Sequence, residues 1–483
     1  MAANIIGEAR RCVSLIRILN CRAFPRRFGE YEELDMSVQA PPTPESIKTT
    51  ATDKPEVRPS EAAAWFPKPV KSFAEAGLDS GIVEALILKY LMGVGSASGG
   101  QIATELCLPA EPIIEYLAGL KHQQIVVHVS AAAMGDFNYR LTEAGMDRAQ
   151  RYMRDSMYVG PAPVPVDQYI AAMRAQTITR CHPRAEDLSR AFSDLLVSKD
   201  MFEILGPAIN SGRGMFLYGY PGNGKTSIAE RITRCFGDNI YIPKCLICDG
   251  FIIKLFDAAS HNVAEQRSDS IFKKDKIDQR WIKITRPTII VGGELTMDTL
   301  EIQYNETSKV CEAPVQLKSN CGTLVIDDFG RQRMRPVELL NRWIVPLEKR
   351  YDFLTMPNGK KLQVPFDQLI IFSTNLEPKD LCDDAFLRRI PYKINVPDPT
   401  EAEYRKLYDF VAPGLGFQID DDARAAIDYL IETHYRKSGR AFRCCQPRDL
   451  MLQVKNRCLY TGREPALTPE MFDYAASVYF TVM

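Results

Sequence analysis

The residues with the clearest chemical meaning form the run Gly-Tyr-Pro-Gly-Asn-Gly-Lys-Thr at positions 219–226. A short apolar stretch, 215–218, precedes this run, and an apolar-periodic stretch follows it, so the context is strand, glycine loop and helix. Glycines let backbone N–H groups turn toward a polyphosphate, and the positive end of the helix favours the same anion. Lys225 has the length to reach the β- and γ-phosphates, and the Thr226 hydroxyl is a ligand for Mg²⁺. The predicted ATP-binding residues are Gly219, Tyr220, Pro221, Gly222, Asn223, Gly224, Lys225 and Thr226.

A second motif is the apolar run 322–326, which ends in the two carboxylates Asp327 and Asp328. It resembles a Walker B motif, in which a buried strand next to the strand of the phosphate loop brings a carboxylate to the Mg²⁺ shell. We expect Asp327 to take that role and Asp328 to polarise the attacking water as a general base. The metal ligands predicted from the two motifs are therefore Thr226 and Asp327.

With both motifs present, the chain resembles the AAA+ ATPase family over roughly residues 185–470. The apolar run that ends at Asn375 resembles the family's sensor 1, which implies that Asn375 helps to orient the water. The run 384–390 resembles the arginine-finger box, which implies that Arg388 or Arg389 enters the site of a neighbouring subunit. Such a finger is worth about 10³–10⁵ in rate.

The tetrapeptide Pro-Arg-Asp-Leu at 447–450 resembles sensor 2 of the same family. The resemblance implies that Arg448, on a helical lid, contacts the γ-phosphate of its own subunit. Each of these later motifs is short, and their order after the first two motifs makes the case. The catalytic residues that the motifs and the resemblance together imply are Lys225, Asp328, Asn375, Arg388, Arg389 and Arg448.

One departure from the family concerns the end of the Walker B strand. Most members carry Asp-Glu there, whereas this chain carries Asp327 and Asp328. The second carboxylate is one methylene shorter, which favours slow, switch-like hydrolysis. Helicase loaders and replication initiators of the same superfamily also carry Asp-Asp, so hydrolysis is still expected.

Residues 354–362 predict a hairpin, because Asn358-Gly359 separates two candidate strands. The position of this hairpin resembles the pre-sensor-1 hairpin of the branch that includes the unfoldases and the MoxR-like chaperones. In those hexamers it faces the central channel, which would place Lys360 and Lys361 near its tip. An ordinary solvated hairpin is the alternative. A second insertion, 257–320, receives no function from its sequence.

The predicted fold is α/β, with a P-loop NTPase parallel sheet flanked by helices, a C-terminal helical lid and an N-terminal winged-helix domain. The first 35 residues carry six arginines, so a transit peptide is an alternative to the favoured interpretation, a disordered extension or a true start at Met36. The predicted divisions are 1–69 extension and linker, 70–158 winged-helix-like domain, 159–184 Pro-rich linker, 185–397 AAA+ α/β domain and 398–483 helical lid.

The winged-helix interpretation rests on helical spacing followed by the phrase Tyr-Arg-Leu-Thr-Glu-Ala-Gly at 139–145. Residues 70–155 contain three Lys and four Arg against ten Asp and Glu, a net charge of −3. The helix that would read DNA carries Glu111 and Glu115. Because duplex binding depends mainly on neutralising phosphates, this charge favours docking of a protein over DNA.

The composition is that of a soluble globular protein, with 46% hydrophobic and 25% charged residues. The net charge of −1 gives no overall field for nucleic acid or acidic lipid. Thirteen cysteines without a repeating frame favour reduced thiols, and the lone Cys245-x-x-Cys248 lacks the partners of a zinc set. No apolar run reaches the length of about 18 residues that a membrane span requires, and a cytoplasmic location is expected.

Together these patterns predict an ATPase that uses ATP and Mg²⁺, assembles as a ring that is most simply a hexamer, and remodels a protein partner. The first alternative is a DNA-associated ATPase of the helicase-loader or transcriptional-activator type. The second is a nucleotide-gated scaffold that binds ATP and barely hydrolyses it.

Overall fold

The computed structural model describes residues 65–237, 239–264, 277–381 and 384–481. The predicted extension and nearly all of the linker after it, residues 1–64, lie outside the described residues. Within the described ranges, no helix combines the length and the apolar composition that crossing a bilayer requires. The cysteines of those ranges are all free thiols.

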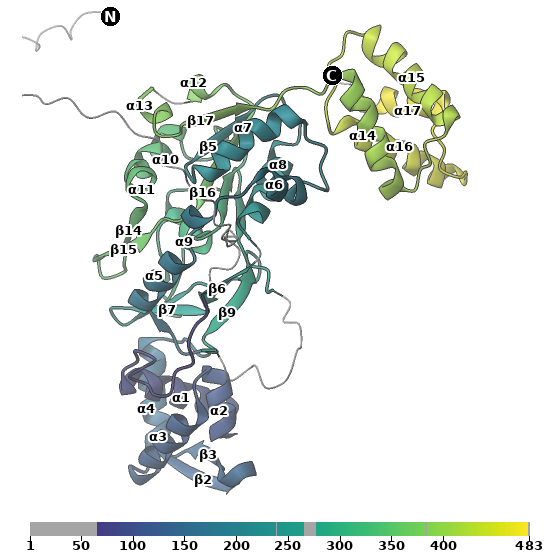
Figure 1. Cartoon of the computed structure of the whole chain (residues 1–483). Helices are drawn as coiled ribbons and strands as arrows, with labels where there is room; N and C mark the ends of the chain where they lie inside the picture. Colours follow the sequence, from purple (N-terminus) through teal and green to yellow (C-terminus); the bar gives the residue numbers. More distant parts are fainter. Residues whose placement is uncertain (1–64, 238, 265–276, 382–383, 482–483) are drawn as a thin grey trace, which may run out of the picture. The chain divides into compact units, whose positions relative to one another are not determined.

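The first described region pairs four helices with a three-stranded sheet (Figure 1). Its elements are α1 Ser80–Val94, β1 Ala97–Ser98, α2 Gly99–Leu106, α3 Ala110–His122, β2 Val126–Ala131, β3 Phe137–Leu141 and α4 Glu143–Asp155. The sheet order is β1-β3-β2, and both pairs are antiparallel. Side chains cap three of the helices: Asp79 caps α1, Ser98 caps α2 and Thr142 caps α4. These caps accept N–H groups that a helix start leaves without an internal partner.

The glycine loop and the carboxylate pair lie on a five-stranded parallel sheet. Its strands are β5 Met215–Tyr218, β10 Thr288–Val291, β13 Thr323–Ile326, β16 Leu369–Thr374 and β17 Tyr392–Asn395. The order is β10-β13-β16-β5-β17, and every neighbouring pair is parallel. The α/β prediction is confirmed. The prediction that the Walker B strand lies next to the phosphate-loop strand was wrong, because β16 lies between β13 and β5.

Helices cover both faces of this sheet (Figure 1). They are α6 Ala185–Ala191, α7 Lys199–Asn210, α8 Lys225–Ile232, α10 Pro336–Arg342, α11 Ile344–Lys349, α12 Pro378–Leu381 and α13 Asp384–Leu387. Alternate residues of β5 point to opposite faces of the sheet and pack into two apolar cores. Met215 and Leu217 pack with side chains of α6, α7 and α8, whereas Phe216 packs with α10 and Trp343. Runs of buried residues such as all six of β16 are expected of strands covered on both sides.

The insertion left unassigned by sequence contributes to a second sheet. The strands of this sheet and of the adjoining two-stranded ribbon and hairpin are β4 Val164–Pro165, β6 Asn239–Pro243, β7 Cys245–Cys248, β8 Phe251–Lys254, β9 Trp281–Thr285, β11 Gln303–Asn305, β12 Val310–Glu312, β14 Tyr351–Thr355 and β15 Lys361–Pro365. The second sheet has the order β11-β12-β8-β7-β4, while β6 pairs with β9 and β14 with β15. A short helix, α9 Val315–Lys318, follows β12.

The segment 159–184 contains regular structure, namely β4 and the helix α5, Val166–Ala175. β4 pairs in parallel with β7. Tyr169 of α5 is fully buried, and its hydroxyl accepts a hydrogen bond from Asn320 Nδ2 at 2.8 Å. This segment is therefore part of the same packing as the second sheet.

The C-terminal residues form a separate helical core (Figure 1). The helices are α14 Glu401–Leu415, α15 Asp421–Leu430, a π-helical turn Ile431–Arg436, α16 Gln446–Thr461 and α17 Pro469–Tyr479. Thr400 and Glu403 form a capping box at the start of α14. Tyr404, Tyr408 and Tyr435 are almost fully buried at the centre of this core.

Candidate nucleotide-binding site

The loop between β5 and α8 has a backbone that only glycine tolerates at two positions. Gly219 and Gly222 have φ values of 136° and 86°. A Cβ atom at Gly219 would lie 2.5 Å from the Val396 carbonyl oxygen, and one at Gly222 would lie 2.7 Å from Cys445 Sγ. Both contacts are closer than real Cβ atoms permit, so these glycines are needed for close approach as well as for the positive φ.

The loop presents a group of backbone donors at the start of α8. In the part of the chain that the structure describes, no protein acceptor takes the N–H groups of residues 222–226. The residue before α8, Gly224, adopts the left-handed conformation. Successive N–H groups of this kind at a helix start form a concave site that suits an anion such as a phosphate.

Lys225 is the first residue of α8, and only 7% of its surface is exposed. Its Nζ donates to the Gly219 and Tyr220 carbonyl oxygens, both at 2.9 Å, and to Asn375 Oδ1 at 2.6 Å. Burial lowers the pKa of Lys225, whereas the nearby charges of Asp327 and Asp328 act in the opposite direction. The ammonium therefore lies inside the curve of the glycine loop and touches the end of β16.

The Thr226 hydroxyl donates to Asp327 Oδ2 at 3.0 Å. Asp327 directly follows β13, and its N–H donates to the Val291 carbonyl oxygen at the end of β10. Two oxygen atoms about 3 Å apart match neighbouring positions in the octahedral shell that Mg²⁺ requires. Thr226 and Asp327, the two residues predicted to hold a metal, are thus brought together with a spacing that suits Mg²⁺.

Asp328 and Asn375 meet across the ends of β13 and β16. Asn375 Nδ2 donates to Asp328 Oδ1 at 3.2 Å, while its Oδ1 accepts from Lys225. Asp328 has a φ of 48°, in the left-handed region. Asn375 therefore joins the lysine of the loop to the carboxylate predicted as the base.

A residue that sequence reasoning missed holds this turn in place. Gln332 Nε2 donates to the carbonyl oxygens of Asp327 at 2.9 Å and Asp328 at 3.2 Å, and its Oε1 accepts from Gly330 N–H at 2.8 Å. No motif marks Gln332, because its role comes from a turn that is visible only in three dimensions.

The two arginines of the predicted finger box differ in their surroundings. Arg389 Nε donates to Glu348 Oε1 at 2.7 Å within the same chain. Arg388 is exposed, and among the described residues it forms no ion pair.

Arg448, predicted from its motif to contact the γ-phosphate, lies on α16 with 61% of its side chain exposed, and its guanidinium donates to the adjacent Asp449. The arginine that contacts the loop is Arg443. Its guanidinium carbon lies 4.4 Å from the centre of the Tyr220 ring, within the range of a cation–π contact. It also forms an ion pair with Asp398.

Asp398 and the peptide before α16 complete the contacts of the loop. Asn223 Nδ2 donates to Asp398 Oδ1 at 2.7 Å, and Cys445 N–H donates to the Gly222 carbonyl oxygen at 2.8 Å. The only sequence signal for this junction is the pair of prolines that flank Asp398. These prolines indicate a connection between domains, but they do not indicate that Arg443 contacts the loop.

A family described as a domain of unknown function (DUF8689) matches residues 400–478, which run from α14 into α17. No curated protein matches the chain. The similarity to this family is thus confined to the C-terminal helices.

Among solved structures, the chain is similar to NtrX from Brucella abortus. For NtrX in complex with ADP, the identity is 16%, the TM-score is 0.35, and the match covers 68% of this chain and 65% of the NtrX chain. For NtrX in complex with ATP, the identity is 17%, the TM-score is 0.35, and 70% of each chain is covered. The chain thus spans less than two thirds of NtrX in the first comparison.

Proposed function

We propose that this chain is an ATP-hydrolysing, Mg²⁺-dependent protein of the AAA+ type, which couples hydrolysis at subunit interfaces to the remodelling of a protein partner. The observation that supports this most is one hydrogen-bonded set at the carboxyl edge of the parallel sheet. It links Lys225, Asn375 and Asp328 in one chain of contacts, and Thr226 and Asp327 in a second. Ligands of open parallel sheets bind at this edge.

The phosphates of ATP would bind to the N–H groups of residues 222–226. Lys225 would exchange its two carbonyl acceptors, Gly219 and Tyr220, for phosphate oxygens, because a charge-assisted hydrogen bond to an anion is roughly twice as strong as one between neutral groups. The metal would be held by Thr226 and Asp327, and when bound it would neutralise charge on the transferred phosphate.

Asp328 would accept a proton from the water that attacks the γ-phosphorus. Asn375 Nδ2 holds the Asp328 carboxylate from one side, so the other oxygen of that carboxylate is directed by the same contact. Because the Asp328 side chain is one methylene shorter than that of Glu, its carboxylate lies farther from the attacking water, which favours slow turnover.

Arg388 is the better candidate for a finger that acts on a neighbouring subunit. Its exposed guanidinium can reach another chain without first breaking an internal ion pair, whereas Arg389 is paired with Glu348. A neighbour's arginine implies an oligomer, and a ring with six copies is the form that the family resemblance favours.

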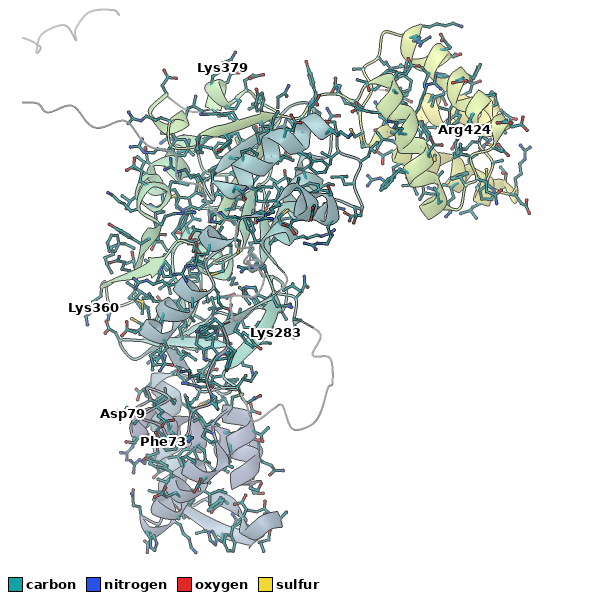
Figure 2. All side chains as sticks on the ribbon, viewed as in Figure 1. Phe73, Asp79, Lys283, Lys360, Lys379 and Arg424 are labelled. Atoms are coloured by element: carbon teal, nitrogen blue, oxygen red, sulfur yellow. The ribbon has the colours of Figure 1, made fainter. Side chains whose placement is uncertain are left out.

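The proposed output is movement against a protein partner. The end of the β14–β15 hairpin carries Lys360, whose Nζ lies 3.0 Å from Asp249 Oδ2 in the β7–β8 turn (Figure 2). Lys360 is still 68% exposed on its side chain, so it is available to a partner. We propose that the surface formed by the hairpin and the β7–β8 turn moves when the nucleotide site changes state.

A DNA partner is less well supported. Residues 71–73 and residues of α3 line the same pocket, and the ring of Phe73, labelled in Figure 2, lies 5.9 Å from the Tyr116 ring. The segment 71–73 thus lies beside α3, and the acidic Glu111 lines the same pocket, which disfavours binding of a phosphate backbone there. Labelled duplex and single-stranded DNA that fail to bind even at low salt would exclude this alternative.

Hydrolysis is tested by phosphate release from the purified full chain with Mg²⁺ and ATP. We expect Lys225→Ala to abolish ATP binding and release, because it removes the cation nearest the phosphates. The control is Lys379→Ala, which removes an exposed lysine of α12 and should change nothing. Release from the wild type no faster than from Lys225→Ala would favour the non-hydrolysing scaffold.

The shared site is tested by mixing two inactive variants. Arg388→Ala should bind ATP and hydrolyse it at least about 10³ times more slowly. When Arg388→Ala and Lys225→Ala subunits are mixed, some interfaces pair an intact loop with an intact finger, so part of the activity should return. If Arg388→Ala alone hydrolysed ATP normally, the trans arrangement would be wrong.

A further inference from the structure

We infer that a pocket at the amino edge of the parallel sheet is an anion site that binds a small organic phosphate with a flat, apolar body. The pocket is lined by α5, α11 and the β14–β15 hairpin, which lie close together in Figure 1, and by the 3₁₀ turn Ile178–Arg180. No motif of the sequence marks this pocket. The inference does not depend on ATP binding elsewhere in the chain.

The pocket is large enough for a small molecule and is separate from the glycine loop. Its volume of about 670 Å³ falls in the range of about 300–1,000 Å³ typical of ligand sites. Arg350 in its wall donates to the carbonyl oxygens of Gly212 and Gln368, which precede β5 and β16. The glycine loop and Asn375 follow the other ends of these strands, and the six residues of β16 span about 20 Å. A ligand in the pocket would therefore not occupy the nucleotide site.

The charge of the lining favours an anion. Four cationic side chains, those of Arg174, Arg180, Lys349 and Arg350, line the pocket against the single carboxylate of Asp367. The formal charge of the lining is therefore +3, whereas the whole chain carries −1. Within the part of the chain that the structure describes, none of the four cations forms an ion pair.

The one carboxylate of the pocket already has partners. Asp367 Oδ1 accepts from the Thr177 hydroxyl at 2.8 Å, and Oδ2 accepts from the Ile178 N–H at 3.1 Å. Burial lowers the pKa of Arg350, although the charge of Asp367 acts in the opposite direction. Since the guanidinium of Arg350 donates to carbonyl oxygens, a bound anion would supply the opposite charge that this partly buried cation lacks.

A purely structural role would not explain the arrangement. Arg174 and Lys349 lie in the last turns of α5 and α11, where a cation stabilises a helix end. That role requires each cation only at its own helix. It does not require the two side chains to line one pocket together with Arg180 and Arg350.

A phosphate monoester suits this lining better than a carboxylate. It carries up to about two negative charges near neutral pH and has three acceptor oxygens, and the planar fork of arginine binds phosphate oxygens in pairs. Part of the remaining wall is apolar and is formed by Ile170, Met173, Val364 and Tyr351. A flat, apolar body can pack against that wall, which free phosphate cannot do.

The test is isothermal titration calorimetry of the full chain with phenyl phosphate, inorganic phosphate and benzoate. Phenyl phosphate has both features of the inferred ligand, and each of the other two lacks one. We expect phenyl phosphate to bind at least about tenfold more tightly than either. Arg180→Gln and Lys349→Gln should each weaken phenyl phosphate about tenfold, the size of one charge-assisted hydrogen bond. The matched control, Lys379→Gln, removes an exposed lysine of α12 (Figure 2) and should change this affinity less than about twofold.

Lys225→Ala distinguishes the pocket from the glycine loop, and phenyl phosphate should bind this variant as it binds the wild type. A larger loss in Lys225→Ala than in Arg180→Gln would mean that the loop binds the phosphate and would overturn the inference, while the proposed function would stand. Failure of the wild type to bind phenyl phosphate, or equal affinity for benzoate, would also overturn it. Thermal unfolding without ligand shows whether each variant folds. Should Arg180→Gln be unfolded, Lys349→Gln decides in its place.

Discussion

Asp328 adopts a left-handed backbone conformation with a φ of 48°, which costs a non-glycine residue about 1 kcal/mol or more. Hydrogen bonds around the turn hold it there. The Gln332 side-chain amide donates to the backbone carbonyl oxygens of Asp327 and Asp328. Thr374 Oγ1 donates to the Phe329 carbonyl oxygen at 2.8 Å. The direction of the Asp328 carboxylate therefore depends on residues that do not touch ATP in the proposed site.

A prediction at this scale concerns Gln332. Gln332→Ala removes three hydrogen bonds of the turn, so the Asp328 carboxylate loses its fixed direction while the glycine loop is untouched. We expect kcat to fall at least about tenfold, with the dissociation constant for ATP within about twofold of wild type. Steady-state hydrolysis and mant-ATP binding measure the two quantities.

The control for Gln332 is Gln363→Ala, which removes an exposed glutamine of β15. It should leave both quantities unchanged. A variant at Gln332 that binds ATP poorly but hydrolyses it at the normal maximal rate would contradict a positioning role.

Much of the site could be predicted from residue types, because the loop and the strand-end carboxylates depend on short local patterns. Lys225 and Thr226 are predicted from the glycine-loop motif and its flanks, and Asp327 from the resemblance to a Walker B motif; the structure brings all three together with Asp328 and Asn375. Arg443 and Gln332 could not be found in this way. Their contacts come from segments that are distant in sequence or from the shape of a turn, and neither leaves a periodic signal.

At the scale of elements, the start of α4 is fixed against β2 by a close backbone approach. Gly145 N–H donates to Thr142 Oγ1 at 3.0 Å, and Thr142 N–H donates to the Ile125 carbonyl oxygen at 3.1 Å. A Cβ atom at Gly145 would lie 2.1 Å from that same carbonyl oxygen. The glycine in the phrase at 139–145 therefore has a physical reason, which is the contact between helix and strand.

We predict that Gly145→Ala destabilises this region by about 1–3 kcal/mol, because backbone must move to admit the methyl group. Gly119→Ala is the matched control: Gly119 lies within α3, where a Cβ meets nothing within 4 Å. That substitution should be neutral or stabilising by up to about 1 kcal/mol. Thermal unfolding followed by circular dichroism compares the two, and equal effects would contradict the packing argument.

Helices were easier to predict than strand partners. The apolar spacing of α1 and α3 is local, so their existence followed from the sequence. The position of β16 between β13 and β5 depends on pairing between distant segments, which periodicity does not encode. The same reason explains why the second sheet, built partly from the insertion at 257–320, was not anticipated.

At the scale of the whole molecule, the helices of residues 70–158 share a core with the second sheet. Cys245, Ile252 and Val310 pack into the same cluster as the apolar side chains of α1, α2 and α3. The fully buried Arg280 joins three segments: it pairs with Asp278 at 2.7 Å and donates to the carbonyl oxygens of Ala76 and Pro163. The first helices thus share packing with the second sheet, and the buried Arg280 adds hydrogen bonds to the segments that contain Ala76 and Pro163.

We predict that Arg280→Ala lowers the free energy of unfolding by about 3–5 kcal/mol, because Asp278 is left buried without its partner. Changing both residues, Arg280→Met with Asp278→Asn, should cost less than the sum of the single changes. Urea unfolding of the full chain measures these differences.

The control is Arg424→Ala, which breaks an exposed pair with Asp409 in the C-terminal helices (Figure 2). An exposed pair is worth at most about 1 kcal/mol, so the effect should be small. A loss at Arg280 as small as the loss at Arg424 would mean that the buried Arg280 does not hold these segments together.

The strand order also has a consequence for how the protein is made. β5, which leads into the phosphate loop, pairs through Met215 with Ile371 and with Tyr392, so both of its neighbours are synthesised long after it. Closing such long loops slows folding. During translation the glycine loop leaves the ribosome without a sheet to hold it, and the proposed nucleotide site is complete only when the last core strand, β17, has emerged.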